Sequence, residues 1–173
     1  ISSGAHDGID AVVDNIAKLV DELGEGGVTG VGIGIAGVID SKSGVITQAP
    51  NIANVTNYPI RDNLVSKLSS GVEVIVENDA NCAALGEWWI GAGKDISSLV
   101  MITLGTGVGG GIILDGKLWS GADGMGGEVG HMTVYPDGAL CNCGNYGCLE
   151  SYASATAVRR MVRETLEKPE VKT

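Results

Sequence analysis

Apolar residues recur along the chain with two different periods. Between residues 5 and 23 they stand at helical spacing with charged residues between them, which predicts an amphipathic helix. Residues 28–38 instead alternate β-branched residues with glycine, a pattern typical of a buried strand. Glycines between these two segments end the helix, so the first 38 residues predict one helix–strand unit.

The same two periods predict the elements that follow. We expect strands at 45–47, 72–77, 98–104 and 112–114, and helices at 59–68, 80–93 and 149–167. Strands alternate with helices in the first half, whereas hairpins dominate the second, which predicts an α/β fold with two lobes. We expect residues 1–78 to form part of the smaller lobe and residues 79–173 to form part of the larger lobe.

Composition and charge narrow the classes of function. The 173 residues are 44% hydrophobic, enough for a globular core, and 11 basic against 21 acidic residues give a formal net charge of −10. That charge disfavours broad contact with nucleic acid or an anionic membrane and leaves a small molecule as the expected partner. No apolar run approaches the roughly 20 residues that span a bilayer, so we expect a cytoplasmic protein. Because the chain opens at Ile1 and ends in a charged, helix-like tail, we expect a piece of a longer protein, incomplete at both ends.

One histidine and three cysteines are crowded into a short segment. His131, Cys141, Cys143 and Cys148 give the pattern H-x9-C-x-C-x4-C. Four nitrogen and sulfur ligands with no fifth candidate nearby describe a closed tetrahedral zinc site, which is structural and not catalytic. The alternative is a set of small buried thiols beside a core histidine. Cys82 stands apart, in a predicted helix of small residues, and is expected in the core.

Two glycine-rich segments, residues 32–37 and 105–110, match the dinucleotide fingerprint G-x-G-x-x-G. In that fingerprint the glycines open a helix whose N-terminus holds a pyrophosphate, but here both segments run into predicted strands. What remains is a turn of Gly105, Thr106 and Gly107, whose backbone N–H groups and hydroxyl form a natural cradle for phosphate oxygens. A glycine-rich hairpin at a crowded sheet contact explains the same residues, and the pattern leaves both readings open.

Asp79 lies between a predicted strand and a predicted helix. Asn and Asp are favoured helix N-cap residues, so Asn78 and Asp79 need no functional explanation. The carboxylate of Asp79 nevertheless follows the C-terminal end of a strand, the edge where open α/β sheets place their ligands. Phosphoryl transfer to a hydroxyl needs one carboxylate that orients the nucleophile and accepts its proton, and Asp79 is the candidate. Glu77 alternates to the other face of the strand and is expected to be solvated or paired.

Four motifs follow one another along the chain. They are V-E-N-D-A-N at residues 76–81, L-G-T-G-V-G-G-G at 104–111, G-E-V-G-H at 127–131 and C-N-C-G-N-Y-G-C-L-E at 141–150. Together they resemble the ROK family of bacterial sugar kinases and repressors, and within it the glucokinases most. The resemblance covers about residues 28–158, and the order of four motifs makes it specific.

The resemblance implies an actin-like, hexokinase-type ATPase fold of the ribonuclease H-like class, with sugar and ATP bound in the cleft between two lobes. Asp79 matches the catalytic base of the family. The residues that match sugar-binding positions are Asn51, Asn78, Asp79, Glu128, His131 and Glu150. Gly105, Thr106 and Gly107 match the phosphate-contacting loop, and His131, Cys141, Cys143 and Cys148 match the zinc ligands.

The activity that the resemblance implies is a hexokinase- or glucokinase-type phosphotransferase. It would take ATP with Mg²⁺ as the phosphate donor, Zn²⁺ as a structural ion, and a hexose, above all glucose, as the acceptor. We also expect a homo-oligomer, a dimer or a tetramer. Two other functions stay open: a sugar-responsive transcriptional repressor of the same family, and a zinc-stabilised binding module. The family's Asp-x-Gly-Gly-Thr hairpin and the C-terminal part of its adenine site are absent from the 173 residues.

Overall fold

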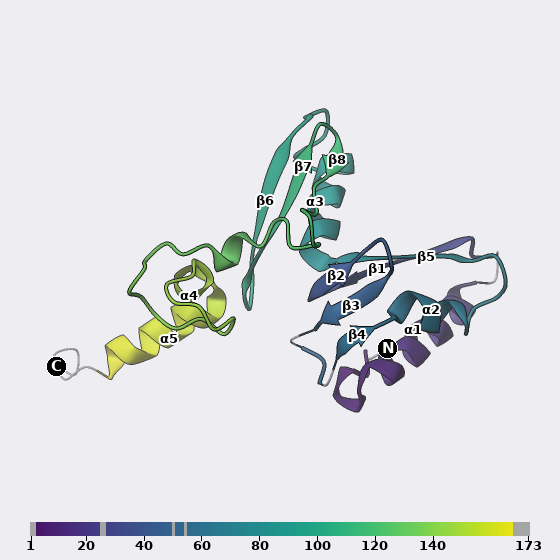
Figure 1. Cartoon of the computed structure of the whole chain (residues 1–173), viewed down its shortest axis with the longest axis horizontal. Helices are drawn as coiled ribbons and strands as arrows, with labels where there is room; N and C mark the ends of the chain where they lie inside the picture. Colours follow the sequence, from purple (N-terminus) through teal and green to yellow (C-terminus); the bar gives the residue numbers. More distant parts are fainter. Residues whose placement is uncertain (1–2, 25–26, 50, 54, 168–173) are drawn as a thin grey trace. The chain divides into compact units, whose positions relative to one another are not determined.

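The computed structural model describes residues 3–24, 27–49, 51–53 and 55–167. The chain divides into two compact units, one of Ile1–Ala83 with Ser120–Met125 and one of Ala84–Trp119 with Gly126–Thr173. Each unit contains both helices and strands (Figure 1), so the α/β composition predicted from the sequence is confirmed. The assignment of residues 1–78 to a smaller lobe and 79–173 to a larger one stays a prediction.

The first unit holds two small sheets. In one, β1 (Gly30–Ile35) pairs in parallel with β5 (Glu73–Asn78), in a register that sets Gly30 opposite Glu73 and Ile35 opposite Asn78. The other is antiparallel, with the order β2 (Val38–Asp40), β3 (Val45–Gln48), β4 (Thr56–Tyr58). Because β1 and β5 are parallel, their carboxyl ends meet at one edge, and Asn78 lies at that edge.

Helices and strands of the first unit share one core. The predicted first helix is confirmed as α1 (Ile9–Leu23), preceded by the short η1 (Ala5–Asp7), and α2 (Ile60–Val65) follows β4. Val13, Ile39, Ile46, Ile60 and Leu64 are at most 1% exposed and belong to one hydrophobic cluster. Apolar residues at helical spacing on α1 and α2 therefore meet the alternating residues of the strands, as the two periods predict.

The second unit contains an antiparallel meander of β6 (Leu99–Leu104), β7 (Val108–Leu114) and β8 (Lys117–Leu118). The predicted glycine loop at 105–111 is shorter than expected, because β7 already begins at Val108. The predicted single helix over 149–167 is also wrong. It divides into α4 (Glu150–Ala153) and α5 (Ala155–Leu166), because extended Ser154 interrupts it and caps α5 with its side chain. The tail at 168–173 lies outside the described residues.

Glycines in β7 allow a loop to lie directly on the sheet. A Cβ on Gly110 would lie 2.6 Å from the carbonyl oxygen of Gly127 and 2.7 Å from a methyl of Val129. The short 3-10 helix η2 (Val129–His131) follows immediately and packs on β7. The crowded-contact reading is therefore confirmed for Gly110. This close contact places the segment that carries Glu128 and His131 against the β6–β7 hairpin.

Helix α3 (Asp79–Ile90) begins directly after β5. None of the helices in the described ranges combines the length and the apolar character that a bilayer crossing requires.

We predict that Leu64→Ala lowers the free energy of unfolding by about 2–5 kcal/mol, because truncation leaves a cavity in the packed core of the first unit. Chemical denaturation followed by circular dichroism measures the change. Leu23→Ala is the matched control: Leu23 is 79% exposed, so its truncation should change stability by less than about 0.5 kcal/mol. Equal losses in the two variants would contradict this description of the core.

Candidate functional site

Four ligand atoms converge in the second unit. His131, Cys141, Cys143 and Cys148 place their nitrogen and sulfur atoms all within 4.8 Å of one another. Nδ1 of His131 lies 3.7 Å from Sγ of Cys141, and Sγ of Cys143 lies 3.7 Å from Sγ of Cys148. Tetrahedral zinc, with bonds of about 2.3 Å to sulfur and 2.0 Å to nitrogen, puts neighbouring ligand atoms roughly 3.6–3.8 Å apart. The four groups therefore fit a tetrahedral zinc ion.

Short backbone turns bring these ligands together. The N–H of Cys141 donates to the carbonyl of Asn145 (2.8 Å), and the N–H of Gly144 donates to the carbonyl of Cys141 (2.9 Å). These bonds fold the C-x-C segment into a tight loop. An isolated antiparallel bridge between Thr133 and Cys148 brings the last cysteine beside the chain that leaves His131. The ligand set is thus assembled without help from a long helix or strand.

The cysteines differ in their acidity. Burial raises the pKa of the Cys148 thiol to about 12, whereas a backbone hydrogen bond at Asn145 lowers the pKa of the exposed Cys143 thiol. Zinc takes up thiolates, so its binding at these residues would displace the proton of Cys148 and would weaken as the pH falls. Cys82 lies outside the cluster; burial raises its pKa, and the charges of Glu77 and Asp79 raise it further.

His131 uses its two ring nitrogens in different directions. Nδ1 faces the sulfur of Cys141, while Nε2 lies 3.7 Å from Oε2 of Glu128. Both side chains are about one-third exposed. A histidine bound to a metal through one nitrogen commonly has its second N–H oriented by a neighbouring carboxylate, and Glu128 occupies that place. The second nitrogen and the carboxylate remain accessible to a ligand.

The turn between β6 and β7 has two backbone amides without an acceptor among the described residues. The N–H of Gly105 donates to the carbonyl of Gly107 (3.0 Å), and the N–H of Val108 donates to Oε2 of Glu150 (2.9 Å). In the described part of the chain, the N–H groups of Thr106 and Gly107 have no acceptor, and Thr106 is exposed. This turn can offer two N–H groups and one hydroxyl to an anion.

Glu150 joins this turn to the cysteine segment. While its Oε2 accepts the N–H of Val108, its Oε1 lies 3.9 Å from Sγ of Cys141. A Cβ on Gly107 would collide with Oε2 of Glu150, so a larger residue there would have to displace that side chain. The N–H of Ala155 also donates to the carbonyl of Gly105 (2.9 Å). Both ends of the turn are therefore fastened to the start of the last two helices.

In the first unit, the junction of β5 and α3 separates the roles of Asn78 and Asp79. Oδ1 of Asn78 accepts the N–H groups of Ala80 (2.8 Å) and Asn81 (3.1 Å), so Asn78 caps α3, and its Nδ2 donates to the carbonyl of Gly37 (3.1 Å). Asp79 is exposed and accepts only the N–H of Ala80 (3.0 Å) among the described residues. The capping role belongs to Asn78, and the carboxylate of Asp79 is left accessible.

Glu77 is paired, one of the two alternatives expected for it. Its Oε1 accepts the N–H of Asn78 (2.7 Å) and Nδ2 of Asn81 (3.0 Å), and its Oε2 accepts the hydroxyl of Ser41 (2.9 Å). Sequence reasoning singled out neither Ser41 nor Asn81. The signal in the sequence was slight: Asn81 is a polar residue among the small apolar residues of a predicted helix. In the structure its side chain is only 2% exposed.

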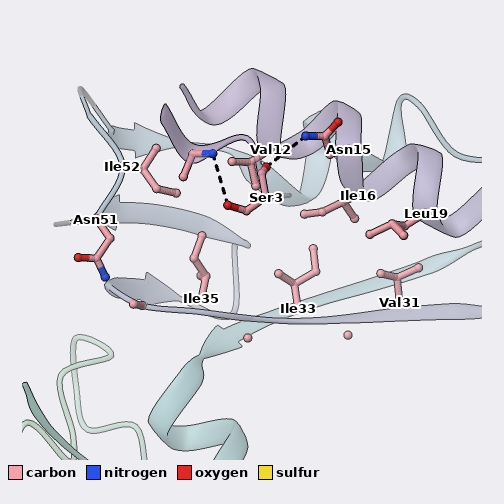
Figure 2. A pocket seen from close by; sticks show the side chains of 14 residues that line it. Ser3, Val12, Asn15, Ile16, Leu19, Val31, Ile33, Ile35, Asn51 and Ile52 are labelled. Atoms are coloured by element: carbon pink, nitrogen blue, oxygen red, sulfur yellow. Dashed lines mark hydrogen bonds between the residues drawn. The ribbon is translucent and has the colours of Figure 1, made fainter. Parts of the chain in front are cut away.

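Asn51 is exposed and lines a pocket of about 540 Å³ between α1 and β1 (Figure 2). Apolar side chains, including Val12, Ile16 and Ile33, make up most of its lining. A sugar requires several convergent hydrogen-bonding groups, so the interior of this pocket does not suit one. A role for Asn51 in sugar binding rests on the sequence resemblance alone.

The predicted residues of the second unit form one continuous series of contacts. It runs from Glu128 to His131, from His131 to Cys141, from Cys141 to Glu150, and from Glu150 to the N–H of Val108. In the first unit, the predicted residues lie at the β5–α3 junction and at the pocket beside α1. The geometry in the second unit thus connects the cluster of His131 and the three cysteines with the turn between β6 and β7.

We predict that Gly107→Ala lowers the free energy of unfolding by about 1–3 kcal/mol, because the new methyl displaces Glu150 and leaves the buried N–H of Val108 without its acceptor. Urea denaturation measures the loss. At Gly105, a Cβ meets no atom within 4 Å, so Gly105→Ala should change stability by less than about 1 kcal/mol. If both alanines cost the same, the contact with Glu150 is not what requires Gly107.

Known sugar kinases and repressors are similar to this chain in sequence. A glucokinase from Thermotoga maritima is 45% identical over 164 residues, which cover 94% of this chain and 51% of that protein. A xylose repressor from Caldicellulosiruptor bescii is 40% identical over 142 residues, covering 82% of this chain and 35% of that protein. The chain therefore spans about half the length of the glucokinase that it matches.

A solved glucokinase structure is similar to this chain as well. A ROK family glucokinase from Streptomyces griseus in complex with glucose and AMPPNP matches with a TM-score of 0.78 and 44% identity, covering 94% of this chain and 52% of that one. The predicted actin-like, hexokinase-type fold class is confirmed by this similarity. The sequence model of the ROK family matches residues 3–173, and the chain belongs to the ROK family.

Proposed function

We propose that the protein is an ATP-dependent sugar kinase that phosphorylates a hexose hydroxyl, with glucose converted to glucose 6-phosphate. The observation that carries the proposal is the turn at Thr106 and Gly107, with its free amides and exposed hydroxyl. Such a turn suits the phosphates of a nucleotide. The similarity to a glucokinase in complex with glucose and AMPPNP, an analogue of ATP, supports the choice of both substrates.

The role we propose for Asp79 is that of the general base. Its exposed carboxylate lies at the start of α3 and is held by no side chain of the residues that the structure describes. Such a group is suited to accept the proton of a sugar hydroxyl as that hydroxyl attacks the γ-phosphate. We assign sugar hydrogen bonds to the side chains that the resemblance names: Asn51, Asn78, Asp79, Glu128, His131 and Glu150. The pairing of His131 with Glu128 supports part of this assignment, since it leaves two polar groups accessible.

The metals have separate proposed roles. Zinc on His131 and the three cysteines would have four protein ligands and no open position, so its role is to fix the fold. Apart from this cluster, the described residues contain no group of three or more side chains suited to a metal. Mg²⁺, which would balance the charge on the phosphates, needs no such group, because it commonly binds through the phosphates, water and one or two carboxylates.

A sugar-responsive repressor is the second candidate, and the 40% identity to a xylose repressor favours it. A repressor can keep the zinc cluster and the sugar-binding residues without transferring phosphate. The free amides of the 105–107 turn favour the kinase, because a protein that only senses sugar needs no phosphate cradle. A winged-helix DNA-binding segment encoded ahead of these residues would indicate the repressor, and an Asp-x-Gly-Gly-Thr motif the kinase. The homo-oligomeric state and the cytoplasmic location stay predictions.

We predict that Asp79→Asn lowers kcat by at least about 100-fold, because the amide cannot accept the proton of the attacking hydroxyl. The variant should keep its sugar affinity within about five-fold, because the remaining hydrogen-bonding side chains are unchanged. Coupled ADP-release assays on the protein as it is encoded, across a panel of hexoses, measure both constants. Retained kcat would exclude Asp79 as the base, and wild-type protein that turns over no hexose would favour the repressor.

Zinc content is a separate prediction. Purified, unchelated protein should contain about one zinc per chain, and Cys148→Ser should reduce this to well below half, because a serine hydroxyl is a poor zinc ligand beside thiolates. Elemental analysis by mass spectrometry gives the stoichiometry. Cys82→Ser, which changes a thiol outside the cluster, should retain the metal. Wild-type protein that contains no zinc would remove the metal from the proposal.

A further inference from the structure

A polar cluster lies behind the β5–α3 junction, beside the residues to which we assign chemistry. The side chain of Glu77 is its centre, and both carboxylate oxygens accept hydrogen bonds. Oε1 receives the N–H of Asn78 (2.7 Å) and the amide of Asn81 (3.0 Å), and Oε2 receives the hydroxyl of Ser41 (2.9 Å). All these groups belong to the first unit and are at least partly buried.

The donor from Ser41 comes from a well-ordered turn. Ser41 lies between β2 and β3, where Asp40 accepts the N–H of Lys42 (3.1 Å) and the hydroxyl of Ser43 (2.6 Å). The guanidinium of Arg61 donates to the carbonyl of Lys42 (2.9 Å) and fixes the same turn from α2. Glu77 therefore connects the start of α3 to a rigid part of the unit.

A second connection runs beside the first. Nδ2 of Asn78 donates to the carbonyl of Gly37, just before β2. The segment between β1 and β3 thus holds the junction at two places, through Glu77 and through Asn78. With its N–H on Glu77 and its Oδ1 on the first turn of α3, the backbone around Asn78 is fixed from both sides.

Asn81 indicates that this cluster serves more than stability. Its side chain is 2% exposed, and its Oδ1 has no hydrogen-bond partner among the described residues. A buried carbonyl oxygen without a partner costs stability, and an apolar residue would avoid that cost. The amide of Asn81 instead holds Oε1 of Glu77 in place. The arrangement maintains the orientation of a carboxylate at the expense of an unsatisfied group.

Asp79 depends on this arrangement because no other side chain among the described residues holds its carboxylate. Its carboxylate has one hydrogen bond in the described structure, to the N–H of the next residue. Its direction is therefore set by the backbone of the junction, which Glu77 and Asn78 fix. Misplacing a catalytic group by about 1 Å can cost 100-fold in rate.

We propose that Glu77 is a positioning residue: through its hydrogen bonds to Asn78, Asn81 and Ser41, it sets the direction of Asp79 for the sugar hydroxyl. In this role Glu77 acts through the side chains and backbone that it holds and needs no contact with the substrate. The inference rests on the proposed kinase function and on Asp79 as the base. It concerns the hydrogen-bonding geometry of Glu77 and not its charge.

The test compares Glu77→Ala with Glu77→Gln in the protein as it is encoded, using glucose, Mg²⁺ and ATP. The alanine variant should lower kcat by about 10–100-fold, with KM for glucose changed by less than about five-fold. Glutamine keeps an acceptor for Asn78 and Asn81 and can donate to the hydroxyl of Ser41, so its kcat should stay within about three-fold of wild type. Ser41→Ala removes only one link and should lower kcat by about two- to five-fold, which keeps the proposal testable where Glu77→Ala does not fold.

Four outcomes would overturn the proposal. Wild-type kcat in Glu77→Ala, at a temperature where the variant is folded, assigns Glu77 a purely structural role. Should the alanine variant not fold, wild-type kcat in Ser41→Ala has the same meaning. Equal losses in the glutamine and alanine variants show that the charge itself is needed. If Asp79→Asn is inactive in the same assay, these three results refute only the positioning role of Glu77. The fourth outcome is wild-type protein that phosphorylates no hexose, which refutes both the positioning role and the kinase function.

Discussion

The convergence of one imidazole and three thiols is the constraint on which the second unit depends. In this unit, residues 126–149 contain one regular element, the three-residue η2, and two isolated bridges. Their large apolar side chains are mostly exposed, with Met132 at 54%, Tyr135 at 62% and Leu140 at 63%. Cys141 and Cys148, in contrast, are buried. A segment that buries so little apolar surface gains little hydrophobic stabilisation, so its path depends on the hydrogen bonds of its turns and on the convergence of the four ligand groups.

This constraint extends to the functional candidates because they lie in the same segment or contact it. Glu128 reaches His131, and Glu150 lies between Cys141 and the turn of the β6–β7 hairpin. Holding the four ligand atoms in one place therefore also limits where these two carboxylates can be. A metal ion there would hold its four ligands and, through them, orient the neighbouring carboxylates of Glu128 and Glu150.

Local patterns predicted most of the fold and part of the candidate site. The amphipathic period of α1 and the H-x9-C-x-C-x4-C spacing each depend on neighbours in the sequence, and the structure contains the helix and the convergent cluster. The interruption at Ser154 was missed because it depends on one residue that leaves the helical conformation while the apolar period continues. Contacts between distant residues, such as Ser41 with Glu77, leave no period in the sequence at all. Glycine patterns were ambiguous for the same reason, since the neighbour that requires Gly110 lies 17 residues away, at Gly127.

The hydrogen bonds of the β6–β7 turn have a consequence for the energetics of binding. The N–H of Gly105 is satisfied within the turn, that of Val108 is satisfied by Glu150, and the carbonyl of Gly105 is satisfied by Ala155. The backbone of the turn is therefore ordered when the chain folds, and its conformational entropy is lost at that stage. An anion that binds to the remaining amides meets a preorganised receptor, so little of its binding free energy is consumed in ordering the loop.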